Sequence, residues 1–340
     1  MSPKYTKDQP FGFNNYVTNI AIVGATGSVG EYITKHLLAT GKHTVTAITR
    51  EDSKSTMPPG VKVAKIKYDQ PDSIVKALQG QQALIITMKT GQNEASKRLI
   101  AAAAKANVPW VVPNEFGPDF ATRSDMGQDS GLLAAVIPVR EAVQEHGVSS
   151  FIGQVSGFWY EYSLATAPQA YGFDFKNKTV TFLDDGLTKM NTSTWEQCGR
   201  ALASLFSLPQ YPQDTKDESV TISRWANDVV RVESFFVSQR DMLDSILRVT
   251  GEKESDWTIK YQPAQERWEE GDAMLKEGGA KFVQGYIQKM YSRVFYKDGS
   301  GDFSDKLDNE HLGLPKEDFD EATKRAVDMV ESGYNYFARG

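Results

Sequence analysis

A glycine-rich loop near the N-terminus constrains the fold more than any other feature of this chain. Residues 24–30 read Gly-Ala-Thr-Gly-Ser-Val-Gly, follow the short apolar run 20–23 and precede a segment with helical periodicity, Glu31–Ala39. Glycines also mark ordinary turns, but this order of strand, glycine turn and helix is the setting that a dinucleotide-binding loop requires. The first glycine permits the tight turn, the second lets the backbone approach a pyrophosphate, and the third lets the helix pack on the strand. The start of the helix then faces the phosphates, so the loop predicts a nucleotide site.

The first half of the chain alternates between apolar, β-branched runs and helical patterns. Short strands spaced by helices predict a parallel, doubly wound sheet with right-handed crossovers, which is an α/β fold of the Rossmann type. The last helix of this half ends near Glu145 and is expected to carry Pro138 in its first turn. The expected strands are 19–23, 44–49, 61–68, 83–87, 110–113 and 149–155, and the other expected helices are 31–39, 72–78 and 93–105.

The character of the chain changes after about residue 157. Two runs, 179–183 and 189–192, read as strands joined through the turn Asp184-Asp185-Gly186. Helices are expected at 194–206, at 238–249 and near 316–331. We therefore predict a Rossmann domain at 17–157 and a smaller α+β C-terminal lobe at 158–340 that binds the substrate. No low-complexity linker separates them, so we expect the two to pack together.

Composition excludes several classes of function. Hydrophobic residues make up 40% of the chain and charged residues 24%, as in an ordinary globular protein. The net charge of −6, with no basic stripe, argues against a nucleic-acid partner. One cysteine, Cys198, permits no intrachain disulfide and favours a reducing compartment. We find no apolar run long enough for a signal peptide or a membrane span, so we expect a cytoplasmic protein.

The residue that ends the second strand distinguishes NAD from NADP. An acidic side chain there binds the ribose hydroxyls, whereas an arginine accommodates the extra phosphate. Arg50 stands at that position, 20 residues after Gly30, and Lys54 adds charge nearby. The sequence therefore predicts NADP(H), with a solvated loop arginine as the alternative. Residues at the carboxyl ends of neighbouring strands complete the expected cofactor set: Gly24, Thr26, Gly27, Ser28, Val29, Gly30, Arg50, Thr87, Met88, Lys89, Asn114, Glu115 and Phe116.

With these residues assembled, the chain resembles the NmrA-like and isoflavone reductase-like group of atypical short-chain dehydrogenases. The resemblance rests on the loop 24–30, the strand end Thr49-Arg50 and the segment 111–119, which reads Val-Val-Pro-Asn-Glu-Phe-Gly-Pro-Asp. Segments 158–162 and 238–243 are similar to a fungal branch of the group. The resemblance implies an NADP-binding Rossmann domain and reduction of phenolic or other aromatic small molecules. Relatives of the NmrA kind instead bind the dinucleotide without turnover and act as redox-responsive regulators.

The chain departs from the family pattern at the catalytic position. Reductases of the group use a lysine near the start of the helix before the sixth strand, and alignment puts Val136 there. A valine cannot transfer a proton. None of the 14 tyrosines has a lysine four residues later, which excludes the usual short-chain dehydrogenase pair. Three substitutes stay open as the proton donor: Lys89, Tyr160 and Glu115.

Each substitute has a structural alternative. Lys89 could instead be solvated or contact a phosphate, and Glu115 could bind nearby backbone amides. Tyr160, with Phe158, Trp159 and Tyr162, could line an aromatic pocket or pack into the core. The four histidines are scattered, so we expect no metal site.

Three functions follow from these alternatives. They are an NADP(H)-dependent reductase of an aromatic small molecule, a redox-sensing regulatory protein, and an enzyme of non-redox chemistry on the same fold. The oligomeric state stays open, with a homodimer as one choice.

Overall fold

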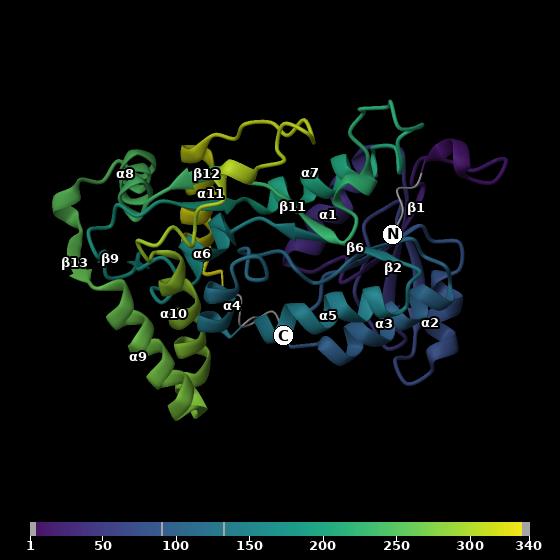
Figure 1. Cartoon of the computed structure of the whole chain (residues 1–340). Helices are drawn as coiled ribbons and strands as arrows, with labels where there is room; N and C mark the ends of the chain where they lie inside the picture. The colour runs from purple at the N-terminus through teal and green to yellow at the C-terminus, as the bar shows by residue number, and fades with distance from the viewer. Residues whose placement is uncertain (1–4, 90, 132, 335–340) are drawn as a thin grey trace.

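A seven-stranded parallel sheet organises the computed structural model, which describes residues 5–89, 91–131 and 133–334 (Figure 1). The strand order is β11-β6-β5-β4-β1-β2-β3, so the order reverses between β1 and β4. Every pairing within this sheet is parallel. The doubly wound Rossmann-type sheet predicted from the sequence is therefore confirmed. Its strands are β1 (Asn19–Val23), β2 (Thr44–Arg50), β3 (Lys62–Ile66), β4 (Ala83–Ile86), β5 (Trp110–Val112), β6 (Ser150–Val155) and β11 (Asp228–Arg231).

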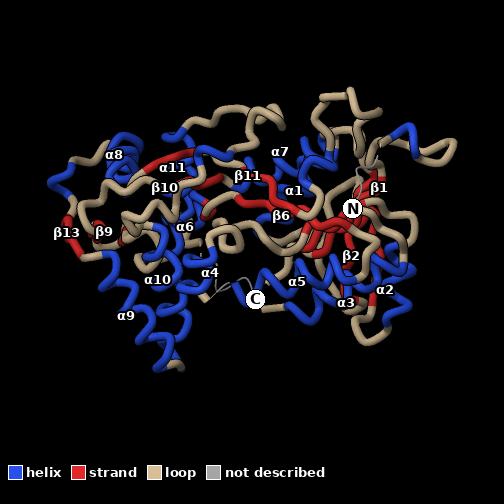
Figure 2. The backbone as a smooth tube through the Cα atoms, in the orientation of Figure 1, coloured by secondary structure: helices blue, strands red, loops and turns tan. Residues whose placement is uncertain are grey.

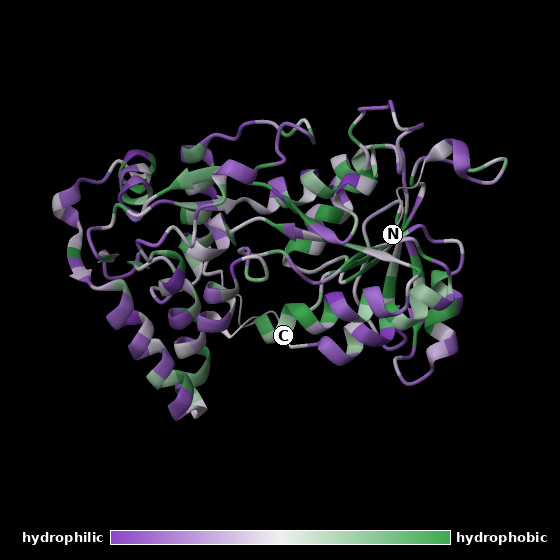
Figure 3. Ribbon diagram, in the orientation of Figure 1, coloured by the Kyte–Doolittle hydropathy of each residue, from purple (hydrophilic) through white to green (hydrophobic). Residues whose placement is uncertain are grey.

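Helices cover both faces of this sheet because side chains alternate along each buried strand. On β1, Ile20 and Ile22 face one apolar layer, whereas Ala21 and Val23 face the other. Figure 1 shows the helices of these two layers on opposite sides of the sheet, and Figure 3 shows hydrophobic residues gathered along its strands. The first layer contains α1 (Ser28–Ala39) and α7 (Trp195–Phe206), and the second contains α2 (Pro71–Leu78), α3 (Asn93–Lys105) and α5 (Leu133–Glu145).

Helix α5 differs from the expectation at its start. It begins at Leu133, so Pro138 lies inside the helix and not in its first turn. Proline has no amide hydrogen to donate to the carbonyl four residues earlier. That carbonyl belongs to Ala134, which is exposed, so water can replace the missing hydrogen bond.

Two small mixed sheets follow in the second half, in the orders β12-β10-β7 and β13-β9-β8. The turn predicted at residues 184–186 is present, and the Gly186 amide donates to the Leu183 carbonyl at 2.9 Å. The strands on either side of it, β9 and β10, nevertheless belong to different sheets (Figure 2). The strands of these sheets are β7 (Phe158–Trp159), β8 (Phe173–Asp174), β9 (Thr179–Leu183), β10 (Met190–Ser193), β12 (Phe235–Val237) and β13 (Thr258–Gln262).

The remaining helices surround a core rich in aromatic side chains. Ser238 caps α8 through a reciprocal pair of hydrogen bonds with Asp241, and Gly251 ends that helix in a left-handed conformation. The α-helices are α4 (Ser124–Ser130), α6 (Tyr160–Thr166), α8 (Gln239–Thr250), α9 (Ala264–Glu277), α10 (Phe282–Val294) and α11 (Phe319–Glu331). Short 3₁₀ helices occur at Thr6–Asp8, Ile222–Trp225, Glu254–Asp256, Gly279–Lys281 and Ser304–Lys306.

Two elements from the predicted C-terminal lobe lie on the large sheet. Helix α7, which the sequence predicts, packs beside α1, and β11, which it does not predict, adds a seventh strand next to β6. Only two of the four residues of β11 are apolar, and so short an apolar run does not indicate a strand. The division of the chain at residue 157 stays a prediction, and the large sheet draws on residues from both sides of it.

Candidate dinucleotide site at the carboxyl edge of the sheet

The glycine turn after β1 is held by very close backbone packing. Gly24 has a φ of +81°, and a Cβ atom there would lie 1.9 Å from the Thr87 carbonyl oxygen. A Cβ atom at Gly30 would lie 2.1 Å from the Gly24 carbonyl oxygen. The Gly27 amide donates to that same Gly24 oxygen at 2.9 Å. No side chain fits at Gly24 or Gly30, which supports the roles that the sequence assigns to the first and third glycines.

Thr87, the residue directly after β4, holds the glycine turn through hydrogen bonds to its backbone. Its amide donates to the Val23 carbonyl oxygen at 2.9 Å. Its hydroxyl lies 2.8 Å from that oxygen and 3.1 Å from the carbonyl oxygen of Gly24. Thr87 is buried, so its side chain serves the turn. Thr87 therefore lies beside the predicted cofactor site, where its hydroxyl contacts the backbone carbonyl of Gly24.

The start of α1 offers unpaired amides to a ligand. Gly27 occupies the N-cap position and provides no side chain to cap the helix. The first amides of a helix have no acceptor within the helix, and the helix dipole favours an anion there. Thr26 and Gly27 are exposed, whereas Val29 is buried in the core. A turn closed by glycines and followed by an uncapped helix fits a phosphate group.

Arg50 ends β2 with its guanidinium in solvent. The side chain is 72% exposed, and its Nε lies 3.8 Å from the carboxylate of the equally exposed Asp52. Such an exposed pair contributes little. Glu51, the other nearby acid, pairs with Lys67 at 3.1 Å. Arg50 is therefore available to an anion at this edge of the sheet.

The tails after β3, β4 and β5 also meet here. The Tyr68 hydroxyl lies 3.7 Å from the Met88 sulfur, and the side-chain amide of Asn114 donates through Nδ2 to the Met88 carbonyl oxygen at 2.7 Å. Burial raises the pKa of Tyr68. Lys89 is exposed, so the apolar enclosure that would suit it to proton transfer is not seen around it. Phe116 is buried against the α1 and α7 layer.

Glu115 does not bind backbone amides through its side chain, which is the alternative that the sequence suggested. Its carboxylate pairs with the Arg140 guanidinium, with Arg140 Nε donating to Oε2 at 3.0 Å and Nη2 donating to Oε1. Glu115 is buried, and burial raises the pKa of its carboxyl while Arg140 lowers it. A carboxylate bound on both oxygens by one guanidinium is poorly placed to give a proton to a ligand.

The aromatic segment that opens the second half divides between two environments. Tyr160 is fully buried in the lobe core, and its hydroxyl lies 2.7 Å from the hydroxyl of Thr323. Burial raises the pKa of Tyr160 far above its ordinary value. This placement argues against Tyr160 as the proton donor. Phe158 stacks on Tyr291 in the same core, while Trp159 packs against Trp195 on the sheet side.

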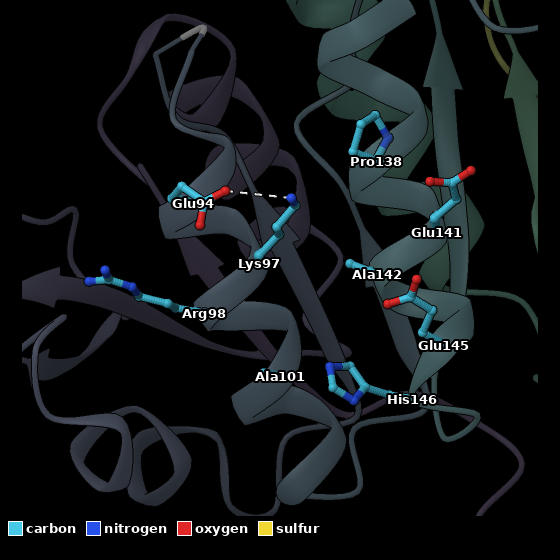
Figure 4. Close-up of a pocket in the computed structure, with 9 residues that line it drawn as sticks. All are labelled: Glu94, Lys97, Arg98, Ala101, Pro138, Glu141, Ala142, Glu145 and His146. Atoms are coloured by element: carbon cyan, nitrogen blue, oxygen red, sulfur yellow. Dashed lines mark hydrogen bonds and ion pairs between the residues drawn. The ribbon is translucent and has the colours of Figure 1, made fainter.

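A surface groove of about 390 Å³ lies between α3 and α5, away from the glycine turn (Figure 4). Its walls carry acidic and basic side chains, including the pair Glu94–Lys97 at 3.5 Å. It contains no residue of the predicted cofactor set. Among the described residues, no cluster of His, Cys, Asp or Glu side chains has the composition of a metal site.

A model of the NmrA-like family matches residues 17–212 of this chain, which include the glycine turn, Arg50 and the whole β5 tail. The chain belongs to the NmrA-like family. The resemblance inferred from the sequence is thereby confirmed. An oxidoreductase of Aspergillus flavus is 27% identical over 89% of this chain and 96% of its own length. An oxidoreductase of Penicillium oxalicum is 26% identical over 90% of this chain and 92% of its own length.

Solved structures share the fold of this NmrA-like chain. The protein AtPrR2, in complex with NADP+ and (+)-pinoresinol, superposes with a TM-score of 0.70 at 19% identity, over 92% of this chain and 99% of that one. The triphenylmethane reductase of Citrobacter, in complex with NADP(H), gives 0.64 at 19% identity, over 91% and 99%. Within the part of the chain that the structure describes, every helix is too short or too polar to cross a membrane.

Proposed function

We propose that this protein is an NADP(H)-dependent reductase of an aromatic small molecule. The observation that carries the proposal is the combination of a glycine turn without room for side chains and an unshielded Arg50 on the neighbouring strand. The turn suits a pyrophosphate, and the guanidinium suits the additional phosphate that distinguishes NADP from NAD. The oxidoreductase relatives and the NADP-bound structural neighbours support the same conclusion.

The residues divide the work of binding between them. The amides at the start of α1 bind the pyrophosphate, and Arg50 binds the extra phosphate. Asn114 and Met88, joined by a hydrogen bond of 2.7 Å, line the edge near the reactive ring. The dinucleotide supplies hydride when bound, and the protein supplies its orientation and a proton.

Lys89 is the strongest of the three candidate proton donors. Tyr160 is enclosed in the lobe core and Glu115 is paired on both oxygens, whereas Lys89 is exposed at the cofactor edge. Val136, at the position of the family lysine, lies half-buried on α5 and carries no proton. We propose that Lys89 approaches the substrate once cofactor and substrate are bound, because its side chain is exposed at the edge where they would lie.

The test is a titration with NADPH and NADP+, followed by absorbance measurements with a panel of phenolic carbonyl and enone compounds. We expect tight NADPH binding and oxidation by at least one compound. The Lys89→Met variant should bind NADPH as the wild type does and lose at least about a hundredfold in kcat. Failure of the wild type to bind either dinucleotide would overturn the proposal.

Arg50 gives a sharper test of cofactor choice. Replacing it with alanine should weaken NADPH by about tenfold or more and leave NADH nearly unchanged, because only NADPH carries the extra phosphate. Thermal unfolding should not shift, since the side chain is exposed. The matched control is Lys42→Ala, which removes an exposed positive charge just before β2, at the end of the strand opposite Arg50, and should leave both affinities unchanged. Equal losses for the two cofactors in the Arg50 variant would show that the guanidinium does not touch the phosphate.

A redox-sensing regulator is the second candidate, and the surroundings of the candidate donors favour it. Neither Tyr160 nor Glu115 is free, and position 136 holds a valine. Tight NADPH binding without oxidation by any compound in the panel would select this function over the reductase. Non-redox chemistry on the same fold and a homodimeric state stay predictions.

A further inference from the structure

The connection between β5 and α5 begins within segment 111–119, one of the segments on which the family resemblance rests. An ion pair anchors the start of this connection. Arg140 reaches back from α5 and binds both carboxylate oxygens of Glu115. The two side chains are 14% and 7% exposed, so the pair is nearly closed to solvent. The Arg140 guanidinium also lies 5.1 Å from the ring centre of Phe151 on β6.

The carboxylate has little freedom to move. A Cβ atom at Gly153 would lie 2.8 Å from Glu115 Oε2, so the carboxylate packs directly on the backbone of β6. The Gln154 amide donates to the Glu115 carbonyl oxygen at 3.2 Å. Both the main chain and the side chain of Glu115 are thus fixed against β6.

The neighbours of Glu115 point to other partners. The Asn114 amide donates to the Met88 carbonyl oxygen, and the Phe116 ring is buried in the α1 and α7 layer. Because Glu115 lies between these two residues in the chain, fixing it against α5 and β6 restrains the backbone that carries both of them. The position of Glu115 therefore determines the position of the cofactor edge.

We propose that Glu115 and Arg140 are positioning residues that hold Asn114 and Phe116 at the cofactor edge, and that Glu115 transfers no proton. The proposal rests on the proposed function, because that function places the dinucleotide at this edge of the sheet. The pairing of Glu115 with Arg140 does not depend on the proposed function. A bidentate pair with arginine suits this role because its planar geometry sets direction as well as distance.

The first experiment uses the protein without cofactor, so it can fail or succeed independently of the proposed function. Hydrogen exchange of the amides in segment 113–120 is compared between wild type, Glu115→Gln and Arg140→Gln. We expect exchange to rise at least about tenfold in each variant, because the segment loses its anchor. Arg140→Lys should give a smaller rise, since an ammonium group cannot pair in the bidentate manner.

The control breaks a comparably buried pair elsewhere. Lys289 and Asp272, each 15% exposed, join α9 and α10 at 2.6 Å. Lys289→Gln should leave exchange in segment 113–120 unchanged. An equal rise in this control would show general loosening and would overturn the positioning role.

The second experiment separates positioning from proton transfer. NADPH affinity should fall about tenfold or more in Glu115→Gln and Arg140→Gln, and by less in Arg140→Lys. The pH profile of turnover should keep its shape in Glu115→Gln, with a lower maximum.

If exchange is unchanged and the acid or base limb of that profile disappears in Glu115→Gln, Glu115 is the proton donor and the proposal is wrong. If wild type binds no NADPH while the exchange results hold, the proposed function fails and the pair stands as an anchor. Should Glu115→Gln not fold, Arg140→Gln and Arg140→Lys decide the matter by the same measurements.

Discussion

The glycine turn at residues 24–30 and the connection that follows β5 meet at one edge of the sheet, but different forces hold them in place. In the turn, backbone atoms of Gly24 and Gly30 pack against each other and against Thr87. In the connection, acidic side chains pair with arginines brought from elsewhere in the chain. Glu115, Asp119 and Asp129 find partners 25, 112 and 164 residues away, namely Arg140, Arg231 and Arg293.

The turn and the connection therefore place different requirements on their residues. The turn needs residues with no side chain, and any added atom collides with the main chain. The connection needs pairs of charges, and each pair costs desolvation that only good geometry offsets. The turn therefore tolerates no substitution at its tight positions, whereas the connection depends on both members of each pair being present.

The turn is broken most directly at Gly24. Gly24→Ala places a Cβ atom 1.9 Å from the Thr87 carbonyl oxygen at a φ of +81°. We expect the free energy of unfolding to fall by about 3–5 kcal/mol, from strain and collision together. Urea unfolding measures this. The control is Gly41→Ala, at a φ of +65° with no atom within 4 Å, which should cost only about 1 kcal/mol. Similar losses at both sites would show that packing on Thr87 is unimportant.

The connection is broken at Arg231. Its guanidinium lies 2.9 Å from the Asp119 carboxylate, and the two side chains are 12% and 6% exposed. Arg231→Met leaves the buried Asp119 carboxylate without its arginine partner. The free energy of unfolding, measured with urea, should therefore fall by about 3 kcal/mol. Lys281→Met removes an exposed pair with Glu277 and should cost less than about 0.5 kcal/mol. If Arg231→Met lowers the free energy of unfolding as little as Lys281→Met does, the ion pairs do not hold the connection in place.

A milder change to the turn is Thr87→Val. The valine keeps the shape and removes the hydroxyl that lies 2.8 Å from the Val23 carbonyl oxygen. That oxygen retains the Thr87 amide as a donor, and the Gly24 oxygen retains the Gly27 amide. We expect a loss of about 1 kcal/mol in thermal unfolding. A loss as large as that of Gly24→Ala would mean that the side chain, and not the backbone, holds the turn.

The smallest effect concerns a buried carboxylate that is only half paired. Arg325 binds one oxygen of Glu161 at 3.1 Å, and among the described residues the other oxygen has no hydrogen-bond partner. Burial raises the pKa of Glu161 above its value in the unfolded chain. A raised pKa stabilises the fold below the unfolded value, near 4.3, and this contribution is lost as pH rises through the folded value. Between pH 4 and pH 7, the free energy of unfolding of the wild type should fall relative to that of Glu161→Gln in urea unfolding. Parallel pH curves for the two proteins would contradict this.

The sheet was largely predictable from the sequence. Strand β1 and helix α3 begin and end where the pattern of apolar residues places them. The signals are local, because alternation, glycine and capping residues act within a few positions. Pro138 shows where such signals fail, since it reads as a first-turn residue and lies inside α5. Strand β11 shows another failure, because only two of its four residues are apolar and such a short run is not distinguished from a loop.

Sequence order alone predicts the glycine turn and Arg50 as a site, whereas it leaves the roles of the polar residues around them open. Glu115 and Tyr160 looked equally able to donate a proton. Folding pairs one with Arg140 and encloses the other against Thr323. The sequence by itself determined the sheet and the turn, because these depend on residues close together in the chain. Only the tertiary structure decided which charges are paired and which groups are buried, because those partners lie far apart in sequence and meet through packing.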